Sequence, residues 1–226
     1  MHIEPGVVDG AKLTLSIATA AGAIGLSAKM AMDTIRNDGG VRALAARSAV
    51  TTAMVFTFFQ VMPHYPVGVS EVHFILGSTL FLLFGGGAAT IGLALGLLIQ
   101  GLFFAQFDLP QYGMNLTTLI VPLWAVSQLA KRIIAPNTAY VDLKYGQAFA
   151  LSTAYQGGVV AWVGFWVFYG QGFGAETMTS FLTFGGAYML VVLVEPLADL
   201  AVLAGAKSLR GLAKGPLFNA RLLRAA

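Results

Sequence analysis

The sequence predicts an all-α integral membrane protein, and three observations support this fold class. The 226-residue chain is 57% hydrophobic and only 10% charged, whereas a soluble domain typically carries about 25% charged residues. Uncharged runs such as 48–70, 72–107 and 145–175 are each long enough to cross the roughly 30 Å hydrocarbon core of a bilayer as a helix. Lys and Arg gather in alternate loops between these runs. We expect one transmembrane helical domain, residues 1–226, that ends in a basic cytoplasmic tail at 206–226.

Seven helical spans follow from the uncharged runs. The run 72–107 holds two short spans, because Gly85-Gly86-Gly87 supplies a turn near its middle. We place the spans at residues 11–32, 43–62, 70–84, 88–106, 115–130, 146–169 and 177–205.

Basic residues set the expected orientation of these spans. Lys and Arg occur in the loop between the first two spans, in the loop between the fifth and sixth, and in the tail, whereas loops 63–69, 107–114 and 170–176 contain neither. Cytoplasmic loops carry the excess of basic residues. We therefore expect an external N-terminus and a cytoplasmic C-terminus, in a multi-pass protein of a bacterial cytoplasmic membrane.

Several function classes are excluded by what the sequence lacks. There are no cysteines, so neither a disulfide framework nor a thiolate metal site is available. No P-loop, zinc-protease or nucleophile-elbow motif occurs. The basic residues flank apolar segments and form no separate domain, which argues against nucleic acid as a partner. We expect a protein that is not an enzyme and that uses no organic cofactor.

The first two residues have the donor groups of a metal chelator. The first ten residues contain no Lys or Arg, so no signal peptide is recognisable and we expect the mature chain to start at Met1. The Met1 amine, the His2 backbone nitrogen and the His2 imidazole close two fused chelate rings around one divalent ion. These nitrogens leave one position open in a square plane, the geometry typical of Ni(II) or Cu(II) with nitrogen ligands.

The segment from Pro63 to His73 holds the other two histidines. Its prolines and Gly68 disfavour a continuous helix, and irregular backbone at membrane depth needs protein or water around it. We expect a loop that folds back into the bundle, with His73 at the start of the next helix. His73 and His64 are both candidates for the open metal position, and His73 also fits an ordinary packed residue.

Two neighbouring polar residues have alternative roles. Glu71 is either a hydrogen-bond acceptor that orients a histidine or a carboxylate that faces water. Asn115 is placed to N-cap the fifth span, and its functional alternative is a hydrogen bond that holds the metal-binding segment.

Three further features carry structural predictions. The small residues of the first span are expected to pack within the bundle or against a partner subunit; they are Ala18, Ala21, Gly22 and Gly25. The acids Glu195 and Asp199 of the last span are costly in a membrane unless they are paired or near the interface, and Lys207 and Arg210 are candidate partners. We expect these acids to be structural or to contact another subunit, with a proton relay as the alternative. The basic tail is expected to contact anionic lipid or a partner subunit.

The chain resembles the cobalt- and nickel-specific substrate-capture subunits of energy-coupling factor transporters, the CbiM/NikM family. The opening Met1-His2-Ile3 with Gly6 is similar to the family's N-terminal signature. The stretch from Tyr65 to His73, followed by Gly77, is similar to its Pro-Val…Ser-x-His…Gly loop. Gln100 with Phe103-Phe104, then Gly113-Met114-Asn115, resembles its Gln-x-x-Phe-Phe…Gly-Ala-Asn stretch. The match departs at Glu4-Pro5, at Glu71 and at Thr118.

The resemblance implies a substrate-capture subunit that binds Co²⁺ or Ni²⁺ in a square plane. Its ligands would be the Met1 amine, the amide and imidazole nitrogens of His2, and His73, with Asn115 holding the loop. The implied partners are a membrane coupling subunit, a pair of ABC ATPases and a small accessory membrane protein. Two alternatives stay open, both with the metal site lost: a capture subunit for another small solute, and a structural subunit of a larger membrane complex.

Overall fold

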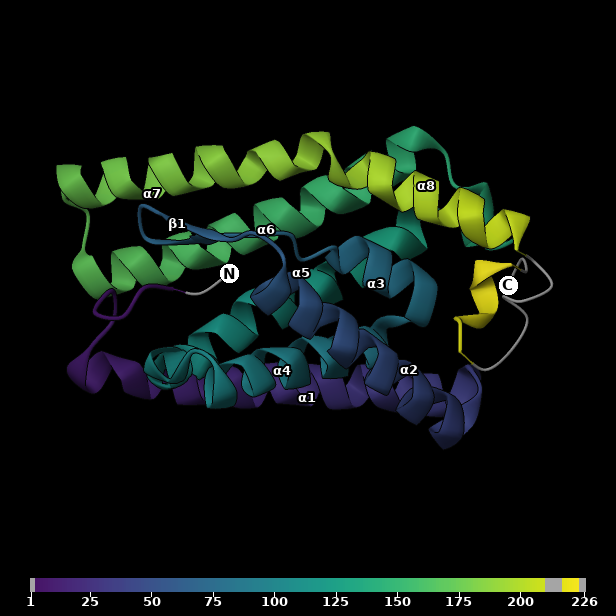
Figure 1. Cartoon of the computed structure of the whole chain (residues 1–226), viewed down its shortest axis with the longest axis horizontal. Helices are drawn as coiled ribbons and strands as arrows, with labels where there is room; N and C mark the ends of the chain where they lie inside the picture. Colours follow the sequence, from purple (N-terminus) through teal and green to yellow (C-terminus); the bar gives the residue numbers. More distant parts are fainter. Residues whose placement is uncertain (1–2, 210–216, 224–226) are drawn as a thin grey trace.

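The computed structural model describes residues 3–209 and 217–223 and consists mainly of helices. Figure 1 shows α7 and α8 end to end along one side of the molecule and α1 along the other, with a short β-hairpin and α3 between them. The helices are α1 (Leu13–Asn37), α2 (Gly40–Phe56), α3 (Gly77–Phe84), α4 (Gly86–Phe103), α5 (Tyr112–Ile133), α6 (Tyr145–Gln171), α7 (Ala175–Met189) and α8 (Glu195–Ser208).

Apolar composition determines most of these helices, and their positions agree with the expected spans. A π-helical turn, Thr57–Val61, extends α2, and a 3₁₀ turn, Leu190–Leu193, joins α7 to α8. Within the described residues, four helical stretches are long and apolar enough to cross a membrane; these are Gly10–Asn37, Gly40–Val61, Gly86–Phe103 and Ala175–Ser208. The chain is therefore a helical, multi-pass membrane protein of the cell membrane.

The prediction of a helix at residues 70–84 is wrong in its extent, because the helix begins later. Strands β1 (Tyr65–Val67) and β2 (Ser70–Val72) form an antiparallel hairpin, and α3 begins only at Gly77. Gly68 turns the hairpin at a φ of 62°, a conformation that glycine adopts at low cost. The eight residues of α3 rise only about 12 Å, so this part of the chain combines a hairpin, an irregular segment and a short helix.

The hairpin and α3 connect opposite ends of the molecule. At one end, Gly68 lies so close to the Ser180 carbonyl of α7 that a side chain on Gly68 would clash with it. At the other end, Gly85 separates α3 from α4, as the sequence predicts, and lies beside Asp38 in the turn between α1 and α2. Val69 and Ser70 are buried, so the expected loop that folds back into the bundle is confirmed.

Small residues bring α4 against α2, whereas the small residues of α1 face outward. Gly92 lies against Thr51, and Gly96 lies against Val55, which lets the two helices approach closely. On α1, Ala18, Ala21, Gly22 and Gly25 are all exposed. The prediction that these α1 residues pack within the bundle is therefore wrong. In the described chain, this face of α1 is open to lipid or to a partner subunit.

The described part of the tail packs against its own chain. The Asn219 N–H donates to the Leu83 carbonyl over 2.7 Å, and the Ala220 N–H donates to Asp38 Oδ1 over 3.0 Å. Leu222 is fully buried, and the Arg221 guanidinium lies over the Tyr140 ring, 5.1 Å from its centroid. Residues 217–223 thus cover the end of the bundle where α3 meets α4.

Candidate metal-capture site

The beginning of the chain enters the bundle beside the hairpin. Met1 and His2, two of the three expected ligand residues, lie outside the described residues. Ile3 is completely buried and forms a β-bridge with Ser70, and the Glu4 N–H donates to the Val69 carbonyl over 3.3 Å. In Figure 1 the described beginning of the chain, drawn in purple, lies between the hairpin and α1. The first described residues are therefore held within the fold as an added stretch of extended backbone.

Asn115 holds this segment from the opposite side. Its side-chain oxygen Oδ1 accepts a hydrogen bond of 2.9 Å from the Ile3 N–H, and its side chain is 1% exposed. The expectation that Asn115 N-caps the fifth span is wrong, because α5 begins at Tyr112 and Gln111 occupies the N-cap position. The Asn115 nitrogen Nδ2 is buried and has no acceptor among the described residues. A buried amide nitrogen almost always donates a hydrogen bond.

His73 lies where β2 gives way to α3. It is 3% exposed and packs edge-on against Phe59, with 4.7 Å between the ring centroids. The strand before it pairs with Ile3 through Ser70, so His73 follows the bridged residue by only three positions. The structure therefore brings His73, Ser70 and the first described residues into one buried region.

The π-helical end of α2 positions the aromatic neighbour of His73. Gln100 of α4 is buried and donates through Nε2 to the Phe59 carbonyl, over 3.0 Å, and to Gln60 Oε1, over 3.3 Å. A π-helical turn leaves carbonyl groups without their usual helical partners, and such turns are frequent at functional sites. Gln100 thus stabilises the turn that presses Phe59 against His73, a role that the sequence pattern did not reveal.

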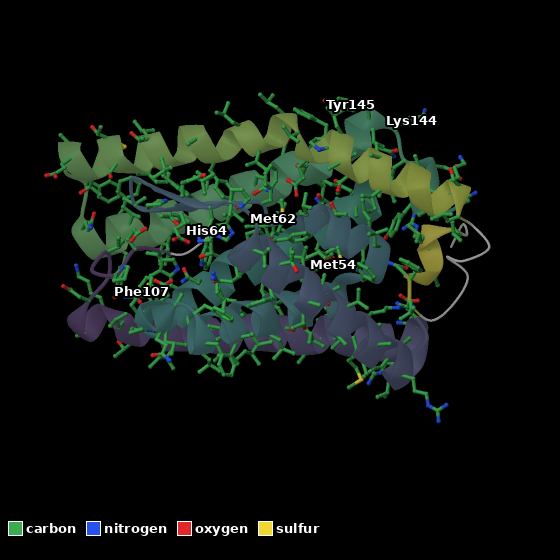
Figure 2. The ribbon with its side chains drawn as sticks, in the orientation of Figure 1. Met54, Met62, His64, Phe107, Lys144 and Tyr145 are labelled. Carbon is green, nitrogen blue, oxygen red and sulfur yellow. The ribbon has the colours of Figure 1, made fainter. Side chains whose placement is uncertain are left out.

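His64, the alternative ligand, is near His73 but in a different environment. The two ring centroids are 6.3 Å apart, and His64 Nδ1 is 3.0 Å from the carbonyl oxygen of Met62. Figure 2 shows His64 and Met62 near the centre of the view. His64 is only partly buried, as is Glu71, which pairs with Pro66 across the hairpin.

Side chains alone do not complete a metal site in the described part of the chain. Over residues 3–209 and 217–223, no three side chains of His, Cys, Asp or Glu come close enough together to hold a metal ion. A metal site at His73 therefore needs donors other than the His, Cys, Asp and Glu side chains of this part of the chain.

Lys207 is not the partner of the buried acids of α8, so that prediction is wrong. Glu195 and Asp199 contact hydroxyl and amide groups of α3 and α6, whereas Lys207 pairs with Asp142 at the end of α8. Arg210 lies outside the described residues. The adjacent hydroxyl residues Ser78 and Thr79, within an otherwise apolar run, are a sequence signal from which the α3 partners of these acids could have been predicted.

Comparison with known proteins identifies one family and one fold. A family model described as the cobalt uptake substrate-specific transmembrane region, CbiM, matches residues 2–211. Among curated proteins, no sequence matches significantly. A crystal structure of a truncated transition metal transporter superposes with a TM-score of 0.69 at 17% identity, covering 92% of this chain and 99% of the other. A second transition metal transporter structure gives a TM-score of 0.68 at 16% identity, covering 93% and 94%.

Proposed function

Because the chain belongs to the cobalt uptake substrate-specific transmembrane family, we propose that it is the substrate-capture subunit of an energy-coupling factor transporter and that its substrate is Co²⁺ or Ni²⁺. The observation that carries the proposal is the hydrogen bond from the Ile3 N–H to Asn115. It fixes the described beginning of the chain beside the segment that bears the buried His73.

The proposed ligands are four nitrogens in a square plane. The Met1 amine and the amide and imidazole nitrogens of His2 supply three of them, and His73 supplies the fourth. Ile3 is fixed between Ser70 and Asn115, so the chain needs to continue only two residues toward His73. The buried Nδ2 of Asn115, which lacks an acceptor among the described residues, fits a hydrogen bond to that continuation.

Charge balance favours this donor set inside a bundle. A bare divalent ion in a buried site carries a severe desolvation cost. When the His2 amide loses its proton, its negative charge cancels one of the two positive charges of the metal ion. The site then buries a net charge of only one. Nitrogen ligands alone favour Ni²⁺ over Co²⁺ and Cu²⁺ over both. Selection against copper therefore falls to metal availability and to the constraint that the fold places on the site.

The proposed topology places the N-terminus outside and the C-terminus in the cytoplasm. The hairpin, the irregular segment 73–76 and α3 together make one pass between opposite ends of the molecule, which brings the number of passes to seven. The chain forms one domain, residues 1–226, with a cytoplasmic tail at 206–226. The basic residues near the α1–α2 turn and in the tail then share the cytoplasmic side.

The proposed partners are a membrane coupling subunit, a pair of ABC ATPases and a small accessory membrane protein. ATP hydrolysis belongs to the ATPases, so this chain is not itself an enzyme. The exposed small-residue face of α1 around Gly22 fits a close contact with a helix of the coupling subunit, because small residues allow helices to approach in lipid.

Metal binding by the purified chain tests the proposal. The chain, with any affinity tag at its C-terminus, is equilibrated with Ni²⁺, and bound metal and the visible absorption spectrum are recorded. We expect one Ni²⁺ per chain with the spectrum of square-planar nickel in a nitrogen field, and loss of both in His2→Ala. An octahedral spectrum that is the same in both proteins would contradict the ligand set. Absence of Co²⁺ and Ni²⁺ binding would favour the two alternatives, a capture subunit for another solute or a structural subunit.

A further inference from the structure

Two buried carboxyl groups lie together at the start of α8, away from the proposed metal ligands. Glu195 is 0% and Asp199 is 1% exposed. They occupy the first and fifth positions of α8, immediately after the 3₁₀ turn that breaks the helix between α7 and α8. Two ionised carboxylates at this depth would repel each other without water to screen them.

Within residues 3–209 and 217–223, no basic side chain contacts this pair. Within the described residues, every hydrogen-bond partner of Glu195 and Asp199 is an uncharged hydroxyl or amide. Titratable groups on the packed elements include Tyr155 of α6, Tyr188 of α7 and the ion pair between Asp142 and Lys207. That ion pair lies at the far end of α8, and each of its side chains is 48% exposed. The described residues would therefore bury a doubly charged anion without a counter-charge.

The hydrogen atoms available to the pair are too few for two ionised groups. The Ser78 hydroxyl is 2.8 Å from Asp199 Oδ2 and 3.5 Å from Glu195 Oε1, yet a hydroxyl donates only one hydrogen. Thr79 donates to Asp199 Oδ1. Ser152 and Gln156 donate to Glu195 Oε2, over 2.7 and 2.5 Å. Glu195 Oε1 is left facing a hydroxyl oxygen whose hydrogen is already used.

Two fully buried polar groups beside the pair have no hydrogen-bond partner among the described residues. Gln156 Oε1, on the same amide that contacts Glu195, is one of them. The Tyr155 ring lies against Gly77, the residue before Ser78, and its buried hydroxyl is the other. Buried polar groups are almost always hydrogen-bonded, so hydrogen bonding around the pair is incomplete over the described residues.

We propose that the pair binds one proton, carried on Glu195 Oε1, while Asp199 stays ionised. The Glu195 hydroxyl then donates to Ser78 Oγ, and the Ser78 hydroxyl donates to Asp199 Oδ2. The gap beside Asp199, lined by Thr79 and Leu203 among others, is too narrow to admit a water molecule, so a hydrated metal cation does not fit there.

With this proton bound, both acids of α8 are linked through Ser78, which stabilises the contact between α8 and the beginning of α3. Ser78 and Thr79 stand in the first turn of α3, and α3 begins four residues after His73. Release of the proton leaves two facing anions, which weakens the contact between α3 and α8. The proposal concerns this contact alone and holds whatever the protein transports.

Infrared spectroscopy of the full chain in phosphatidylcholine nanodiscs tests the proposal directly. At neutral pH we expect the carbonyl band of one protonated carboxyl group, which disappears reversibly in alkali. The band should be lost in Glu195→Gln and kept in Glu176→Gln, whose carboxyl is exposed. In Asp199→Asn the band should disappear at a lower pH than in the wild-type chain, because the neighbouring negative charge that opposes ionisation of Glu195 is replaced by a neutral amide. The assignment of the band rests on Glu195→Gln.

Thermal unfolding as a function of pH supplies a second readout. A group that is protonated in the folded state and ionised in the unfolded state makes stability fall as pH rises. We expect this fall in the wild-type chain and a flatter profile in Glu195→Gln, because the amide of Gln does not ionise and donates a hydrogen bond at every pH.

An infrared spectrum of the wild-type chain without the carbonyl band, or a band unchanged in Glu195→Gln, would overturn the proposal. So would recovery of alkaline stability by Na⁺ at constant ionic strength, which would make the ligand a metal cation.

Discussion

The backbone N–H of Ile3 donates to the side chain of Asn115, 112 residues later in the chain. Ile3 also bridges to Ser70, and His73 lies three residues beyond Ser70. One residue near the beginning of the chain is thereby fixed to both α5 and the hairpin. The proposed capture site depends on this arrangement more than on any single ligand.

Replacement of Asn115 by Ala should weaken metal binding without removing a ligand. The change leaves the buried Ile3 N–H without an acceptor, at a cost of about 1–3 kcal/mol. Residues that orient metal ligands typically contribute about 10–100-fold to metal affinity, and we expect a loss of that order for Ni²⁺ by isothermal titration calorimetry. Asn137→Ala, at an exposed loop position, is the control. Equal affinities in the two variants would contradict the role of Asn115.

The two hairpin-region histidines should respond differently to substitution. His73→Gln should abolish Ni²⁺ binding, because His73 is buried beside Ile3 and Ser70. His64→Gln should retain it, because His64 Nδ1 already contacts the carbonyl of Met62. Thermal unfolding of both variants without metal shows whether the fold survives. Retained binding in His73→Gln together with lost binding in His64→Gln would reverse the ligand assignment.

Substitution of Gly170 should weaken metal binding, although Gly170 is not one of the proposed ligands. A side chain at Gly170 would clash with the Val7 carbonyl, and the Gly170 carbonyl itself accepts a hydrogen bond of 2.7 Å from Lys12 Nζ. Gly170→Ala should therefore push the N-terminal segment away from α6, lowering stability by about 1–3 kcal/mol and reducing Ni²⁺ affinity. Gly157→Ala, on the same helix with open space around it, should do neither. Unchanged affinity in Gly170→Ala would separate the N-terminal segment from metal binding.

Metal affinity should fall as the solution becomes more acidic. The proposed ligands bind metal only after the amine, the amide and the imidazoles have lost their protons. Titrations with Ni²⁺ between about pH 8 and about pH 6, a range in which imidazole changes its charge, should show affinity decreasing steadily, with protons released on binding. Affinity that is independent of pH over this range would rule out the nitrogen ligand set.

Composition predicted the long helices, but it could not predict the path of the third pass. Apolar runs determine α1, α2, α4 and α6 because a membrane span needs little more than length and hydrophobicity. The apolar residues after Ser70 looked equally helical, yet pairing of β2 with β1 and with Ile3 uses their backbone groups instead. Such pairing joins distant parts of the chain and leaves no local pattern.

The candidate site was predictable only in part for the same reason. His73 and Asn115 were singled out by residue type and by the family resemblance, and the hydrogen bond of Asn115 to Ile3 corresponds to the functional alternative weighed for it. The contact of Gln100 with the π-helical turn and the partners of Glu195 depend on how α4, α6 and α8 pack. Helix packing of this kind is set by the whole fold, so neither contact was expected.

The central claim is that the chain's own first nitrogens bind the metal, and one added residue tests it. The chain beginning at Met1 and a variant with a single Gly before Met1 are purified side by side, equilibrated with Ni²⁺ and analysed for metal by mass spectrometry. We predict one Ni²⁺ per chain for the protein that begins at Met1 and almost none in the extended variant, whose terminal amine is displaced from the chelate. Equal nickel content in the two proteins would contradict the account.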